Sequence, residues 1–168
     1  MKRILLPLVL LIALRGFAQQ GPLESPLLDH LAGSWELQGR IAGQETTHDV
    51  VAAWDIQHRY LRIHEISREK TGAGQPQYEA TIYVAWNEPI KQFGCVWLDV
   101  YGGLSQESLG LATATENELP FIFKDARGNV TFSNVFGYDP KSDTWEWRMD
   151  NVVDGAHKPF GRVKLKRK

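Results

Sequence analysis

The stretch Leu31-Ala32-Gly33-Ser34-Trp35 decides the fold class of this chain. Its Gly-x-Trp pattern opens the segment Trp35 to Ile41, in which apolar residues (Trp35, Leu37, Ile41) alternate with Glu36, Gln38 and Arg40. Alternation with a period of two indicates a β-strand that buries one face. At the first strand of an all-β chain of this length, the pattern favours a closed barrel with a ligand cavity.

Strand signals recur along the rest of the chain, separated by turn residues such as Gly102-Gly103 and Arg127-Gly128-Asn129. The expected strands are 35–41, 46–54, 59–68, 78–86, 92–101, 109–115, 121–124, 130–138, 144–149 and 160–167. About ten strands joined in order predict a single closed or nearly closed antiparallel up-and-down barrel. Residues 26–31 predict a short helical turn before the first strand, placed to plug one end of the barrel.

The N-terminus has the pattern of a secretory signal peptide. Lys2 and Arg3 precede an apolar run from Ile4 to Leu14, and Gly16-Phe17-Ala18 puts small residues at positions −3 and −1 of a cut after Ala18. The run is too short for a membrane span, which needs about 20 residues. We therefore expect a signal peptide over 1–18, a linker over 19–26, a barrel domain over 27–168, and a secreted or periplasmic protein.

The net charge and the cysteine content argue against some classes of function. Cleavage after Ala18 removes three of the 19 basic residues and none of the 20 acidic ones, which leaves a net charge of −4. This argues against nucleic-acid binding. Cys95 is the single cysteine, so no intramolecular disulfide can form. Its alternating surroundings predict a small buried residue and not a nucleophile.

The middle strands mix aromatic and polar residues on one face, which fits a lined cavity better than a solid core. On the third strand Tyr60, Arg62 and His64 share a face, opposite Leu61 and Ile63. We predict that the ligand-binding residues are Trp54, Tyr60, Arg62, His64, Tyr83, Trp97 and Trp147.

The chain resembles the calycin superfamily, which includes lipocalins and fatty-acid-binding proteins. The resemblance rests on Gly33-Ser34-Trp35, the meander of strands and a basic residue closing the last strand. Arg59-Tyr60-Leu61, Trp97-Leu98-Asp99 before two glycines, and the terminal Arg-Lys are similar to bacterial secreted lipocalin-like domains of unknown function. The resemblance implies that Trp35 packs across the barrel base, with Arg167 above it as a structural closure.

The favoured function is binding of a small, largely apolar molecule in the cavity, with no cofactor. A small barrel enzyme of the lyase or isomerase type, using Tyr60, Arg62, His64, Tyr83 and Asp99, is an alternative. No catalytic motif at fixed spacing supports it, so binding is favoured over catalysis. For Asp99, a hydrogen bond to the Gly102-Gly103 turn is the favoured interpretation.

The histidines are the candidate ligands for a metal ion or a haem. His64-Glu65 resembles the start of a zinc-protease motif, but position 68 is arginine and the segment is strand-like. His48, His58 and His64 fall on or next to adjacent strands, although ordinary satisfied histidines are favoured over a metal site. The resemblance to nitrobindins, haem-binding relatives of the calycins, makes His157 the candidate haem ligand in a further alternative.

Overall fold

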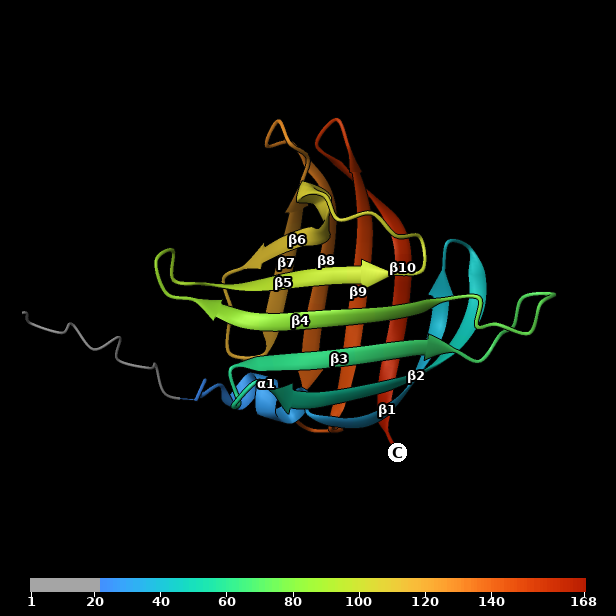
Figure 1. The fold of residues 1–168 in the computed structure, drawn as a ribbon, viewed down its shortest axis with the longest axis horizontal. Coiled ribbons are helices and arrows are strands. Elements are labelled where there is room, and N and C mark those ends of the chain that lie inside the picture. The colour runs from blue at the N-terminus through green and yellow to red at the C-terminus, as the bar shows by residue number, and fades with distance from the viewer. Residues whose placement is uncertain (1–21) are drawn as a thin grey trace, which may run out of the picture.

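The computed structural model describes residues 22–168. Here ten antiparallel strands each pair with the next, and β1 (Gly33–Ile41) pairs with β10 (Ala156–Arg167) to close the barrel (Figure 1). The other strands are β2 (Gln44–Asp55), β3 (Tyr60–Ser67), β4 (Glu79–Asn87), β5 (Gln92–Asp99), β6 (Leu109–Ala112), β7 (Glu118–Lys124), β8 (Val130–Asp139) and β9 (Thr144–Val153). A short 3-10 helix, Gln106–Ser108, precedes β6. The predicted up-and-down barrel is confirmed.

The predicted helical turn is α1, Pro26–Leu31. The Ser25 hydroxyl accepts a hydrogen bond from the Leu28 amide, and Pro26 occupies the first turn, where its missing N–H costs nothing. Leu28 and Leu31 are fully buried in the barrel core. The helix therefore plugs one end of the barrel. None of the helices within residues 22–168 is long and apolar enough to cross a membrane.

The last hairpin is longer than expected, because β9 runs on to Val153 and β10 already begins at Ala156. Asp154 and Gly155 have positive φ angles of 51° and 77°, as a tight two-residue hairpin turn requires. The Asp-Gly pair between two alternating segments is the signal that indicates this turn. Pro159 is accommodated where the register between β9 and β10 shifts.

The inward faces follow the alternation on the first and last strands. Trp35 and Leu37 on β1 and Val163 and Leu165 on β10 are buried in one core. Cys95 is also buried, as expected. The expected signal peptide, over 1–18, and residues 19–21 of the expected linker lie outside the described residues.

Candidate ligand-binding site

A cavity of about 790 Å³ occupies the barrel interior and opens at its rim. Its apolar wall is made by Trp97 of β5, Phe123 of β7, Phe132 of β8, and Trp147 and Met149 of β9. The rim includes Gln44 at the start of β2 and Leu104 in the loop before β6. A largely apolar hollow with a few polar groups is typical of a small-molecule site.

A chain of polar side chains crosses one wall of this cavity. The Nδ1 atom of His48 contacts Oε1 of Glu65, and both residues are almost completely buried. The Nε2 atom of His48 lies 2.7 Å from the Thr46 hydroxyl, which lies 3.0 Å from Oε2 of Glu69. The β2–β3 register pairs Val50 with Glu65, so Glu65 and His48 are diagonal neighbours on the inward face.

The hydrogen-bond partners determine which atoms of these four polar side chains carry protons. Burial raises the pKa of Glu69, but hydrogen bonds from its own amide, the Thr47 amide and the Thr46 hydroxyl outweigh burial and lower it. The ionised Glu69 only accepts, so the Thr46 hydroxyl donates to it and accepts from Nε2–H of His48. One proton then remains between Nδ1 of His48 and Glu65. The His48–Glu65 pair is neutral as a whole. Among the four hydrogen-bonded side chains, the net negative charge therefore resides on Glu69.

Tyr78 and Trp97 add a second polar feature to the same wall. The indole Nε1–H of Trp97 donates to the Tyr78 hydroxyl at 2.9 Å, and the Tyr78 ring stacks on His48 with centroids 5.7 Å apart. Burial, reinforced by the nearby charge of Glu65, raises the pKa of Tyr78 far above its usual value. The phenol therefore stays protonated, and it keeps its hydrogen and one lone pair for a further hydrogen bond.

Deeper in the barrel, three buried polar side chains lack hydrogen-bond partners among the described residues. They are Trp145 and Trp147, each through its indole N–H, and Asn134, through both atoms of its amide. Trp147 lines the cavity, while Asn134 lies opposite Met149 of β9 in the β8–β9 register. A buried polar group without a partner costs roughly 1–3 kcal/mol. A polar atom of a bound molecule that reached these groups would recover that cost.

The predicted ligand-binding residues are divided between several places. Trp97 and Trp147 line the cavity. Trp54 is partly buried beside α1, where its Nε1–H donates to Asp29 at 2.9 Å and its ring stacks on His58. Trp54 is therefore part of the plugged end of the barrel and does not line the cavity.

The assignment of Tyr60, Arg62, His64 and Tyr83 to the interior is corrected. On β3 the buried residues are Leu61, Ile63, Glu65 and Ser67, so Tyr60, Arg62 and His64 alternate onto the outer face. His64 pairs there with Glu79 at 2.9 Å, and Arg62 lies 3.9 Å from Asp55. The register pairs Tyr83 with Arg62, so Tyr83 also lies on the outer face. The apolar pair Leu61 and Ile63 determined which face is buried.

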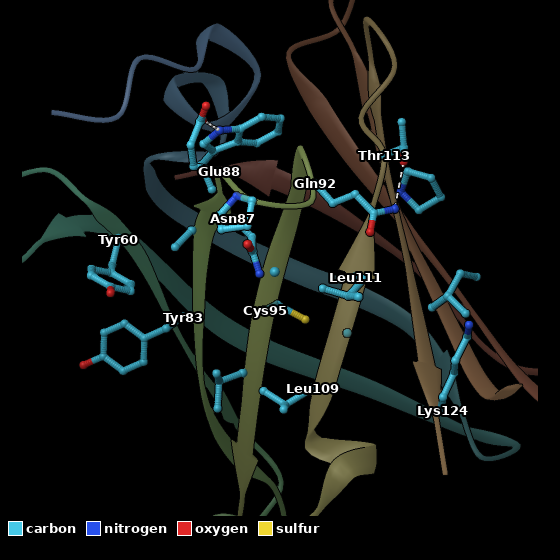
Figure 2. Close-up of a pocket in the computed structure, with 18 of the residues that line it drawn as sticks. Tyr60, Tyr83, Asn87, Glu88, Gln92, Cys95, Leu109, Leu111, Thr113 and Lys124 are labelled. Atoms are coloured by element: carbon cyan, nitrogen blue, oxygen red, sulfur yellow. Dashed lines mark hydrogen bonds between the residues drawn. The ribbon is translucent and has the colours of Figure 1, made fainter. Parts of the chain in front are cut away.

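Tyr60 and Tyr83 lie instead at the edge of a hollow on the outer wall (Figure 2). Their rings meet edge to face with centroids 6.4 Å apart. Figure 2 shows Leu109 and Leu111 in the same hollow, and Gln92, which donates to the Thr113 hydroxyl at 3.1 Å. The hollow has a volume of about 850 Å³, and the barrel wall separates it from the interior cavity.

The structure does not bring together the residues predicted for the enzyme alternative, and it does not place the predicted haem ligand in the cavity. Asp99 lies at the cavity rim, where its carboxylate accepts from the Tyr101 amide at 3.0 Å and its backbone carbonyl accepts from the Gly102 amide at 3.0 Å. Asp99 therefore belongs to the turn before the two glycines, although its side chain binds Tyr101 and not the glycines. Its predicted catalytic partners on β3 and β4 point outward. His157, the haem candidate, is half-exposed and lies 3.4 Å from Asp150 outside the cavity lining. Within residues 22–168, no three His, Cys, Asp or Glu side chains are grouped to hold a metal.

The sequence interpretation missed Glu65 and Tyr78, and for His48 it favoured an ordinary satisfied histidine over a place in a functional site. A signal for Glu65 was present, because it continues the alternation of Leu61 and Ile63. A glutamate is rarely buried unless it is paired, so the alternation alone does not indicate a buried position for it. The compensating histidine comes from another strand, at a register that the sequence does not give.

The chain matches no protein-family model, and a search of curated proteins finds no match.

Proposed function

We propose that this protein binds a small, largely apolar molecule inside its barrel, as a lipocalin-like protein of the bacterial periplasm or the extracellular space. The observation that carries the proposal is the interior cavity of about 790 Å³, whose aromatic wall includes Trp97 and Trp147. The buried Trp147 indole N–H has no hydrogen-bond partner within residues 22–168, which supports an occupant that reaches the deeper part of the cavity. The location rests on the signal-peptide pattern that ends at Ala18.

Binding of the neutral fluorescent probe N-phenyl-1-naphthylamine tests the proposal. The probe is expected to bind, and transfer of energy from the cavity tryptophans should report its position. Phe132→Ala, which removes an apolar side chain from the cavity wall, should weaken binding by about tenfold. Leu111→Ala is the matched control, because it removes an apolar side chain from the outer hollow.

Circular dichroism and thermal unfolding establish that both variants are folded. A probe that fails to bind the folded wild-type protein would overturn the proposal. Weakening by Leu111→Ala but not by Phe132→Ala would also overturn it, because the probe would then occupy the outer hollow. Native mass spectrometry of gently purified protein gives an independent measurement, with a co-purified small molecule as the expected result.

A further inference from the structure

The ionisable side chains that line the cavity are almost all acidic. Five carboxylates line it, and no lysine or arginine does so among the described residues. The five are Glu45, Glu65, Glu69, Asp99 and Glu107. The one further ionisable group able to carry a positive charge is His48, and it shares a single proton with Glu65.

Three of these carboxylates, Glu69, Asp99 and Glu107, form no ion pair among the described residues. Glu45 is paired with Arg40 at 2.9 Å, and Glu65 is neutralised within its pair with His48. Glu69 accepts from uncharged groups, namely the Thr46 hydroxyl and the Thr47 amide. Asp99 accepts from a backbone amide. The cavity and its rim therefore present negative charge to an entering molecule.

This charge distribution discriminates between apolar ligands by their head groups. A carboxylate head group would be repelled by the like charges of the cavity. It would also lose its hydration without gaining a cationic partner, so the free energy of desolvation would not be recovered. A protonated amine would meet Glu69 as a counter-charge, and it carries three hydrogen-bond donors that carboxylate oxygens accept. Trp97 and Trp147 line the same cavity, and an indole face in contact with a cation attracts it through its π system. One face of Trp147 is already covered by the stacked ring of Phe136.

Building on the proposed function, we propose that the ligand is a hydrophobic amine whose protonated nitrogen binds near Glu69 and whose apolar body contacts Trp97 and Trp147. The polar chain on the wall places the fixed charge beside the aromatic side chains. The buried Trp147 N–H is an independent sign that the occupant reaches past the rim, because that group has no partner among the described residues.

Displacement of N-phenyl-1-naphthylamine by decylamine, decanol and decanoate at pH 7 tests this proposal. The three competitors share one alkyl chain and differ in the charge of the head group. Decylamine should displace the probe at a concentration about tenfold lower than decanoate, with decanol between them. Added salt should reduce the difference, because the rim charges are partly exposed to solvent.

Two isosteric variants locate the discriminating charge. Glu69→Gln should raise the concentration at which decylamine displaces the probe until it is close to the concentration needed for decanol. The concentration needed for decanol should stay unchanged. Glu79→Gln is the matched control, because Glu79 pairs with His64 on the outside of the same wall and should leave the order of competitors as in the wild type.

The outcomes separate this inference from the proposed function. Absence of probe binding would overturn binding in the barrel altogether. Probe binding with decanoate as effective as decylamine would overturn the amine inference and leave the binding function standing. An amine preference that survives Glu69→Gln in full would also overturn it, because the discriminating charge would then lie elsewhere.

Discussion

The guanidinium carbon of Arg167 lies 4.1 Å from the ring centre of Trp35, at the plugged end of the barrel. The Trp35 indole N–H donates to the Leu31 carbonyl at 2.8 Å, and Arg167 donates to the carbonyls of Ala32 and His30. These contacts join the last strand, the first strand and α1. Arg167 also binds Asp143 at 2.7 Å, which adds the β8–β9 turn to the closure.

Arg167→Ala should lower the free energy of unfolding by about 1–3 kcal/mol, because it removes a cation–π contact and several hydrogen bonds at once. Chemical denaturation followed by tryptophan fluorescence measures the change. Arg40→Ala is the control, since Arg40 of β1 forms a largely exposed ion pair with Glu45 of β2. Its cost should stay below about 1 kcal/mol. Equal costs for the two variants would contradict a special role for Arg167.

Gly33→Ala should destabilise the barrel by about 1–3 kcal/mol. Gly33 has a φ of +140°, and an added Cβ would lie 2.5 Å from Nη1 of Arg167. The glycine of the Gly-x-Trp pattern is therefore required by the closure itself. Gly72→Ala is the control, because an added Cβ there has no neighbour within 4 Å. Thermal unfolding compares the two, and a Gly33→Ala protein as stable as Gly72→Ala would refute the explanation.

Glu65→Ala should cost about 2–4 kcal/mol, because it leaves His48 buried without the group that shares its proton. Glu79→Ala should cost less than about 1 kcal/mol, because its partner His64 is partly exposed to water. The two variants remove the same side chain from His–Glu pairs on opposite faces of the wall. Urea denaturation at pH 7 measures both. A cost for Glu79→Ala equal to that of Glu65→Ala would show that burial does not set the difference.

The stabilisation contributed by Asp49 should depend on pH. Hydrogen bonds from Arg68, at 2.7 Å, and from Lys168 lower the pKa of Asp49 from 3.8 to about 2. A carboxyl whose pKa is lowered by folding stabilises the protein above its unfolded pKa, and this contribution disappears as pH falls through the folded value. Asp49→Asn should therefore be less stable than wild type at pH 7, and the difference should shrink between about pH 4 and pH 2. Denaturation at a series of pH values checks this, and a constant difference would contradict it.

The thiol of Cys95 should be unreactive in the folded protein. Burial raises its pKa to about 12, so almost no thiolate is present at pH 8. Reaction with a disulfide reagent should be slow in native buffer and fast after addition of denaturant. Fast reaction in native buffer would show that the wall between β5 and β6 opens to solvent.

Much of the fold could be predicted because its signals are local. Alternation together with turn residues predicts a strand at each of the ten positions, and Pro26 with the leucines that follow predicts α1. The last hairpin was expected to be shorter, although Asp154-Gly155 is a strong turn signal. The site was harder to predict, because it depends on which of two partly apolar faces of β3 points inward. The sequence shows both faces with similar apolar content.

The strand order and the helical plug follow from the amino-acid sequence alone, because each depends on local periodicity or on chain order. The pairing of Trp35 with Arg167 at the closure was expected from the resemblance to the calycins. The tertiary structure decided the polarity of the cavity. Glu65 is tolerated inside because the β2–β3 register brings His48 to it, and Glu69 is held by Thr46 and Thr47 from a neighbouring strand. Burial of a charge depends on partners distant in sequence, and only the folded chain brings them together.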